Sequence, residues 1–506
     1  MTRYMGTETE FGIATPAQPE FSPIISSTHA VATYAALHTS ARSRWDYVSE
    51  SPLKDLRGFD LRRYHTVPVV EPDAVGVANV VTSNGGRFYV DHAHPEFSTP
   101  EVTSAWDALR YDVAGQVIAQ QAIDAVAEVS GRGVSVLKNM DPCPAIKMYK
   151  NNVDGKGASY GSHENYLFRR ETDFTTMAQG LIPFFVARQV VIGAGRVGLG
   201  EEGQTPGFQI SQRADYFYQE ISLETTLNRG IINTRDEPHA DADQWRRLHV
   251  IIGDANMSHT SILLKLGMTA LVMDAIEEGE SFRDLALTEP VAALQVISHD
   301  PTLRTTVELK DGRRLSALEI LAEYRQKVQA RTPEEESILT LWDEVTTDLA
   351  ADPLRAADRL DWAAKWALIS SYTRRGLSID DPKIKLIDLQ YHDVDPARSL
   401  YHALVAKGRM RTLLSTEEIE AAVENAPEDS RAWLRGYLVS RWGEEVIAAN
   451  WQSVILASPK GNATVRMDAL DAGRAAQVRE ACEDAADVSA LLEALESCGL
   501  SITYFS

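Results

Sequence analysis

The sequence contains few cysteines, and they are not arranged to act together. Only three occur in 506 residues, Cys143, Cys482 and Cys498, and their positions lack the spacing of a metal site. Disulfides are rare in reducing compartments, where cysteines of this kind remain thiols. The cysteine usage therefore indicates a cytoplasmic protein.

Long apolar runs and an excess of positive charge are also absent. There is no stretch of about 18 apolar residues, and the first residues lack the apolar segment of a signal peptide. We therefore expect no membrane association. The 50 basic and 72 acidic side chains give a net charge of −22, which argues against non-specific binding to nucleic acid. With 44% hydrophobic residues, the chain suits a large globular protein with a substantial core.

Two acidic segments carry the strongest functional signal. Residues 3–13 alternate in polarity as an opening strand would, so Glu8 and Glu10 would project from the same face. A second strand is expected between a glycine pair that ends at residue 86 and Pro95. One face of this second strand would carry Arg87, Tyr89 and Asp91.

Rows of charge like these are not typical of an apolar core. Two carboxylates about 4 Å apart repel by roughly 4 kcal/mol at an effective dielectric constant of about 20. Such a row therefore usually has a divalent cation, a cationic ligand or water beside it. A solvated face explains either strand alone equally well, but the two strands together, with Glu96 just beyond, favour a magnesium site.

A glycine-rich motif at residues 190–198 is a competing signal. It fits the G-x-G-x-x-G pattern of dinucleotide-binding proteins and follows a predicted strand at 189–192. That pattern needs a helix to open at the last glycine, so that the helix amino end meets the pyrophosphate. Residues 199–207 are rich in glycine and contain a proline, which makes them a poor helix. We therefore interpret the motif as a turn between strands.

Two polar loops hold further candidate ligands. Residues 151–165 contain Gly-Lys-Gly without the spacing of a Walker A loop, and no elbow motif supports a serine nucleophile beside His163. Residues 233–241 contain Arg235, whose planar fork suits phosphate, and His239, a possible cation ligand. Taken alone, such residues more often simply belong to a solvated loop.

The pattern along the chain predicts a large domain over residues 1–430 and a small domain over 431–506. Residues 39–76 show no clear periodicity, and we expect a mobile inserted loop there. Helices are expected at 30–37, 104–129, 259–278, 359–372 and, in one or two pieces, 473–496. Strands are expected at 145–148, 189–192, 208–210, 247–252 and 451–456.

Several motifs resemble the pupylation enzymes, a family within the carboxylate-amine ligase superfamily. They lie at residues 6–12, 89–96, 149–157 and 231–243, and the resemblance spans essentially the whole chain. It implies an α+β fold of the glutamine synthetase type, in which helices back a curved, antiparallel-rich sheet and a small C-terminal α/β domain follows. The long segment at 39–76 and the Asp-His-Ala-His-Pro-Glu run at 91–96 favour the hydrolytic branch of the family over its ligases.

The resemblance implies an ATP- and Mg²⁺-dependent amidohydrolase whose partners are the prokaryotic ubiquitin-like protein Pup and pupylated proteins. It would deamidate the C-terminal glutamine of Pup and hydrolyse the isopeptide bond between Pup and a substrate lysine. One alternative is an ATP-consuming Pup–protein ligase of the same fold. Another is a catalytically silent Pup-binding protein, which the intact acidic row disfavours.

The same resemblance implies roles for individual residues. Asp91 would be the catalytic carboxylate, either as general base, which we favour, or as nucleophile. Magnesium would be bound by Glu8, Tyr89, Glu96, His163 and His239. The nucleotide would be contacted by Glu8, Glu10, Arg87, Thr99, Arg235 and Trp451.

Overall fold

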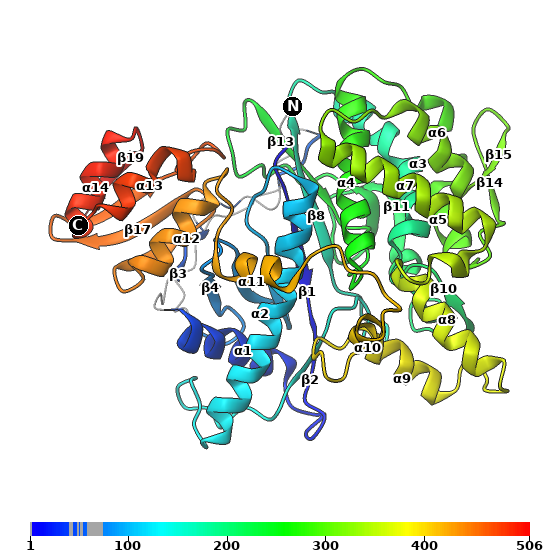
Figure 1. The fold of residues 1–506 in the computed structure, drawn as a ribbon, viewed down its shortest axis with the longest axis horizontal. Coiled ribbons are helices and arrows are strands. Elements are labelled where there is room, and N and C mark those ends of the chain that lie inside the picture. The colour runs from blue at the N-terminus through cyan, green and yellow to red at the C-terminus, as the bar shows by residue number, and fades with distance from the viewer. Residues whose placement is uncertain (1–2, 40–43, 48–49, 51–53, 58–73, 506) are drawn as a thin grey trace.

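The computed structural model describes residues 3–39, 44–47, 50, 54–57 and 74–505 (Figure 1). Most of the segment at 39–76, for which the sequence predicts a mobile loop, lies outside the described residues, and its mobility stays a prediction. Its described parts include the short strand β3 (Arg44–Trp45) and a bridge between Asp55 and Arg235.

A six-stranded antiparallel sheet forms the centre of the molecule (Figure 1). Its order is β13 (Trp245–Val250), β8 (Ser162–Arg169), β1 (Met5–Glu10), β6 (His94–Ser98), β5 (Arg87–Asp91) and β4 (Asn79–Val81). The first strand of the chain therefore lies in the middle. A tight turn at His92, whose φ is 51°, joins β5 to β6. Pro95, which was expected to end the second strand, instead lies within β6 and pairs with Val90.

Helices cover one face of this sheet and build the main core. Helix α1 (Pro23–His38) packs against β5 and β6, α2 (Ala105–Gly131) against β1, and α4 (His259–Glu277) against β8. Helix α3 (Phe174–Ile192) packs on α4. Ser104 and Ser258 cap α2 and α4, since each hydroxyl accepts a hydrogen bond from the backbone N–H three residues later.

Helices α3 and α4 are long and apolar enough to cross a membrane by length and composition. However, 83% of the apolar window of α3 and 94% of that of α4 are buried inside the protein. Both are therefore core helices. Their sequences are apolar on all sides because neighbouring elements surround them.

The remaining elements extend the helical layer and edge it with short strand pairs. The helices are α5 (Pro290–Ser298), α6 (Ala317–Lys327), α7 (Pro333–Ala351), α8 (Asp361–Thr373), α9 (Pro382–Tyr391), α10 (Leu400–Ala406) and α11 (Thr416–Glu424). The antiparallel pairs are β2 (Gly12–Ala14) with β7 (Lys147–Tyr149), β9 (Arg196–Leu199) with β10 (Thr205–Gln209), and β14 (Thr306–Glu308) with β15 (Arg314–Ser316). Strand β11 (Phe217–Ser222) runs parallel to β12 (Arg229–Asn233).

A second, five-stranded sheet contains four strands from the C-terminal end, in the orange-to-red part of Figure 1, and β3 from near the N-terminus. Its order is β19 (Ser501–Phe505), β18 (Gly461–Arg466), β17 (Ser453–Ser458), β16 (Val446–Ala449) and β3. It packs with α12 (Ala432–Arg441), α13 (Ala475–Glu483) and α14 (Val488–Ser497) around a separate apolar cluster. That cluster also includes Trp45 and Val81, and the domain boundary expected after residue 430 stays a prediction.

The helices expected at 104–129 and 259–278 are confirmed as α2 and α4. The strand expected at 189–192 is wrong, because these residues form the last turn of α3. A short, wholly apolar run is equally compatible with a buried strand and a buried helix. The glycine-rich motif therefore follows a helix and leads into β9, the reverse of the dinucleotide pattern, and it lies at the start of a strand pair.

Candidate functional site

One face of the central sheet gathers acidic and histidine side chains from five strands. Since side chains alternate along a strand, residues that are directly paired across strands share a face. On this face the register pairs Glu8 with His163, Glu10 and Tyr89 with Glu96, Asp91 with His94, and His249 with Asn165. The alternation expected for the first two acidic strands thus builds one continuous polar face.

Two groups of side chains on this face could each hold a metal ion. The ligand atoms of Glu8, His163 and His249 lie within 4.8 Å of one another, and so do those of Glu10, Asp91 and Glu96. Magnesium prefers carboxylate oxygens, whereas imidazole nitrogens suit other divalent metals as well. The all-carboxylate group therefore fits Mg²⁺ directly, and the first group offers a mixed oxygen and nitrogen set.

Glu8 is held by donors on three sides. His163 Nδ1 donates to its Oε2 at 3.1 Å, and Asn165 Nδ2 donates to its Oε1 at 3.0 Å. Arg247 Nη1 lies 3.5 Å from the same Oε1. Burial disfavours the charged form, but the His163 hydrogen bond, the two neighbouring histidines and, as the smallest contribution, Arg247 outweigh it and hold the pKa of Glu8 well below its usual range. Glu8 is therefore a fixed, ionised carboxylate.

His249 is neutral and oriented. Burial, which outweighs the attraction of Glu8, lowers the pKa of His249 well below its usual value. The Nδ1 of His249 lies 3.0 Å from Asn165 Oδ1, and since that amide donates its own N–H to Glu8, the oxygen accepts from the imidazole. This tautomer leaves Nε2 of His249 with a free lone pair, the form in which histidine binds metals.

In the second group, His94 and the backbone N–H of Gly161 outweigh burial and lower the pKa of Glu10, whereas Glu96 lacks such compensation. Burial and the neighbouring carboxylates of Asp91, Glu10 and Glu8 raise the pKa of Glu96 well above its usual value. Burial and the charge of Glu96 likewise raise the pKa of Tyr89, so its phenol is neutral. A divalent cation among these side chains would remove the repulsion that raises the pKa of Glu96.

Asp91 is the most accessible carboxylate of this group. Its side chain is 41% exposed, and one oxygen lies 3.0 Å from Nδ1 of His92, itself exposed at the turn between β5 and β6. Glu96 and Glu10 are buried. The position at a strand end allows Asp91 to meet a substrate that approaches from solvent while its neighbours stay covered.

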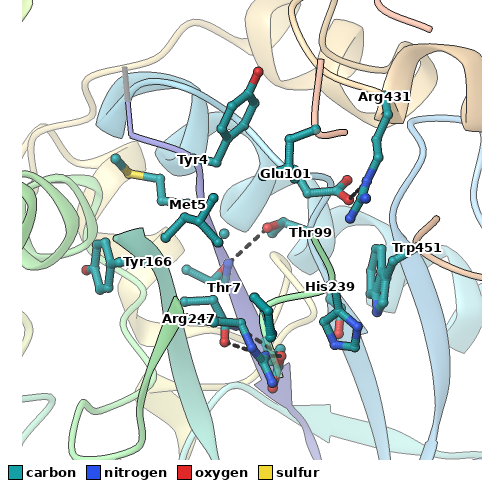
Figure 2. Close-up of a pocket in the computed structure, with 17 residues that line it drawn as sticks. Tyr4, Met5, Thr7, Thr99, Glu101, Tyr166, His239, Arg247, Arg431 and Trp451 are labelled. Atoms are coloured by element: carbon teal, nitrogen blue, oxygen red, sulfur yellow. Dashed lines mark hydrogen bonds and ion pairs between the residues drawn. The ribbon is translucent and has the colours of Figure 1, made fainter. Parts of the chain in front are cut away.

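A cavity borders this face at the Glu8 end (Figure 2). Its wall includes Glu8, Thr99, His239, Arg247 and Trp451, and Figure 2 shows His239 and Trp451 side by side. At Gly6, on the same face of β1, an added Cβ would lie 2.9 Å from Thr99 Oγ1. A glycine is therefore favoured here because β1 approaches Thr99 closely, and a larger residue would force Thr99 in the cavity wall to move.

The base of the cavity is held by an ion-pair network. Glu101 accepts from Arg431 Nε at 2.8 Å and from Arg435 Nη2 at 2.5 Å, as Figure 2 shows in part. Burial opposes the charge of Glu101, but these two guanidinium groups lower its pKa to about 2. Both arginines belong to the part of the chain from residue 431 to 505, which we call the C-terminal unit. Arg435 also donates to the backbone carbonyl of Trp451, so the network fixes this tryptophan beside the central sheet.

Two further arginines flank the polar face. Arg87 projects from β5, and its Nε donates to Asn79 Oδ1 at 3.1 Å. Arg235 lies close enough to His249 and Arg247 to lower the pKa of both, after burial and other neighbours. Its Nε is buried without a hydrogen-bond partner in the described residues. An anion at this position would satisfy Arg235.

The structure brings most of the sequence-predicted residues together. Glu8, Glu10, Tyr89, Asp91, Glu96 and His163 share the polar face, and Thr99 and Trp451 line the adjoining cavity. His239 lies in the cavity wall, and in the described residues neither ligand group includes it. His249, which was not among the predicted ligands, stands beside His163 instead, with ring centroids 4.8 Å apart. Only the pairing of β13 with β8 reveals this position.

A sequence model described as Pup-ligase protein matches residues 3–455 of this chain. The chain is 49% identical over 508 residues to a Pup deamidase/depupylase of Mycolicibacterium smegmatis, covering 98% of both proteins. It is 39% identical over 416 residues to a Pup–protein ligase of Pseudarthrobacter chlorophenolicus, covering 78% of this chain and 89% of the ligase.

Two solved structures share the fold. A complex between Pup and its ligase matches with a TM-score of 0.77 at 29% identity, covering 98% of this chain and 93% of the ligase. A Pup ligase in complex with ADP matches with a TM-score of 0.70 at 31% identity, covering 87% of this chain and 97% of the ligase. The expected α+β class, with helices behind an antiparallel sheet, is confirmed.

Proposed function

We propose, since this chain belongs to the Pup-ligase family, that it is an amidohydrolase acting on Pup. It deamidates the C-terminal glutamine of Pup and hydrolyses the isopeptide bond between Pup and lysines of pupylated proteins. The full-length similarity to a Pup deamidase/depupylase carries this proposal, because the ligase matches at lower identity and over less of the chain. We also propose a cytoplasmic location, in keeping with the cysteine usage.

ATP and Mg²⁺ are the proposed cofactors, and the residues present fit them. The ADP complex of a related ligase supports nucleotide binding, and we place the nucleotide in the cavity beside β1. Trp451 offers an aromatic wall for the base, and Arg87 and Arg235 offer planar donors for phosphates. For the cations we assign Glu8, Glu10, Glu96, His163 and His249, with Tyr89 paired beside Glu96. Asp91 of the carboxylate group is kept for the proton transfer, and His239, expected as a metal ligand, is assigned to the cavity wall.

Asp91 performs the central proton transfer in this proposal. It takes a proton from the attacking water and returns it to the departing amine, whether that amine is ammonia or a lysine side chain. Its exposure at the end of β5 suits a bulky protein substrate. Bound magnesium would polarise the amide carbonyl and keep the surrounding carboxylates ionised. Direct attack by Asp91 on the carbonyl carbon is the alternative, and it predicts a trapped acyl-enzyme.

The test is a cleavage assay with purified protein and a Pup–lysine conjugate. Release of the lysine-bearing protein on a gel should require both ATP and Mg²⁺. Formation of conjugate from free Pup and a target protein, with consumption of ATP, would instead identify a ligase. A protein that binds Pup and changes neither substrate would contradict both enzymatic proposals.

A further inference from the structure

A continuous stack of aromatic rings and guanidinium groups connects the C-terminal unit to the polar face. Its members are Arg435 of α12, Trp451 after β16, Trp45 of β3, and Arg87 and Tyr89 of β5. Arg435 Cζ lies 4.9 Å from the Trp451 ring centroid, and Trp451 meets Trp45 edge to face at 5.2 Å. Arg87 Cζ lies 3.8 Å from the Trp45 centroid and 3.9 Å from that of Tyr89. We call these five residues the aromatic stack.

Trp45 and Tyr89 both pack against the guanidinium of Arg87, whose Cζ lies 3.8 Å from one ring centroid and 3.9 Å from the other. Together with the hydrogen bond from Nε to Asn79, these two contacts restrain the guanidinium group. The terminal nitrogens of Arg87 are therefore held in a fixed direction. Arg87 is buried, and the attraction between a cation and an aromatic face is strongest where water is excluded.

Trp45 also sets the charge beside Arg87. Its indole Nε1 donates to Glu50 Oε1 at 2.6 Å, and that same oxygen lies 3.8 Å from Arg87 Nη1. Burial raises the pKa of Glu50 despite the opposing charge of Arg87. One indole therefore fixes the plane of the arginine and holds its nearest carboxylate.

The backbone around Trp45 is tied to the strand that leads to Trp451. Strand β3 runs parallel to β16 with Trp45 paired to Ala449, and the N–H of Asp46 donates to the Ala449 carbonyl at 2.9 Å. Trp451 follows Ala449 by two residues. Trp45 is only 3% exposed and contacts both Arg87 and Trp451. It therefore connects these two side chains and restrains both.

We infer that Trp45 is a positioning residue for the nucleotide, acting through Arg87 on the phosphates and through Trp451 on the base. This inference rests on the proposed function, which places the nucleotide in the cavity that Trp451 lines. Trp45 itself touches neither the cavity nor the metal-ligand groups in the described residues. Its contribution is preorganisation, which lowers the cost of ordering the two side chains when the nucleotide binds.

The test compares three tryptophan variants in the full-length protein. Trp45→Leu should raise the KM for ATP about tenfold and change kcat less than twofold, because it removes ordering of the binding groups and leaves Asp91 intact. Trp45→Phe keeps a ring of weaker cation affinity and should raise KM only two- to threefold. Trp442→Leu is the matched control, because it removes a similarly buried indole from the same apolar cluster. It should lower the melting temperature comparably and leave KM unchanged.

Two outcomes would overturn the inference. One is a Trp45→Leu protein with reduced thermal stability and a wild-type KM. The other is a wild-type KM in Trp45→Phe when Trp45→Leu cannot be obtained folded. Arg87→Ala and Trp451→Ala separate this failure from that of the proposed function. If both weaken ATP binding and Trp45→Leu does not, only the role of Trp45 is rejected; if neither does, the nucleotide site itself is misplaced.

Discussion

The two faces of the central sheet differ in whether their buried charges are paired within the chain. On the helix-covered face, Glu164 accepts from both terminal nitrogens of Arg188, at 2.7 and 2.8 Å. Asp112 forms an ion pair with Lys150 there and also accepts from Thr7. On the other face, Glu10, Asp91 and Glu96 stand within ligand distance of one another. One face is balanced within the chain, and the other has a surplus of negative charge.

The comparison is sharpest at two consecutive residues of β8. His163 faces the surplus side and contacts Glu8, whereas Glu164 faces the helices and contacts Arg188. A buried ion pair without surplus contributes to structure and needs nothing from outside. A buried surplus is relieved either by a bound cation or by protonation, as the raised pKa of Glu96 indicates, and such sites are where ligand binding is expected. Because side chains alternate along the strand, the structural ion pair and the ligand-binding group lie on opposite faces.

The largest expected effect is on turnover, at the surplus face. Asp91→Asn should lower the rate of Pup–lysine hydrolysis by about 10²–10⁴, the usual contribution of a general acid–base group. The amide keeps the shape of the side chain but cannot take a proton. ATP affinity, measured by calorimetry, should change little, because Asp91 lies at the exposed strand end. A variant that keeps a tenth or more of the wild-type rate would remove Asp91 from the mechanism.

The sequence was sufficient to predict this face in part. Alternation over residues 3–13 and 87–91 correctly placed Glu8 with Glu10 and Asp91 with Tyr89, because a period of two needs only local information. His249 could not be found this way, since it reaches His163 only through the pairing of β13 with β8, more than 80 residues apart along the chain. The register of distant strands depends on the whole fold and leaves no local pattern.

The balanced face predicts a loss of stability rather than of binding. Lys150→Met should lower the free energy of unfolding by about 3–5 kcal/mol, because it leaves Asp112 buried without its cation. Urea denaturation measures this, and the KM for ATP of the folded fraction should be unchanged. Lys460→Met provides the control, since its pair with Glu493 is exposed and should contribute little to stability. Equal effects of the two variants would contradict the division between the faces.

Removing a carboxylate from the polar face should have the opposite effect: it should lower metal affinity and leave stability unchanged or higher. Glu96→Gln relieves the crowding among the three acids, so the metal-free protein should be as stable as the wild type or more stable. Its affinity for Mg²⁺ should fall by at least about tenfold, because losing a direct ligand should cost no less than losing a residue that only orients one. Glu164→Gln, the matched change on the other face, should lower stability and leave Mg²⁺ affinity unchanged, because Arg188 loses its partner. Calorimetric Mg²⁺ titration and thermal melting in EDTA distinguish the two patterns.

The smallest effect concerns Glu101, where a balanced network meets the cavity. Its pKa of about 2 in the folded protein lies below the ordinary 4.5, so the folded state gains stability that is complete above pH 4.5 and is lost as the pH falls towards 2. Between pH 6 and about 3.5 the wild type should lose about 1 kcal/mol more than Glu101→Gln, which has no carboxyl to protonate there.

Glu428→Gln, which breaks an exposed pair with Arg479, should keep the wild-type slope. Since Glu101 holds Arg435, whose guanidinium packs against Trp451, ATP affinity should weaken over the same acidic range in the wild type. An identical acid dependence of Glu101→Gln and the wild type would show that this network is not what joins the C-terminal unit to the cavity.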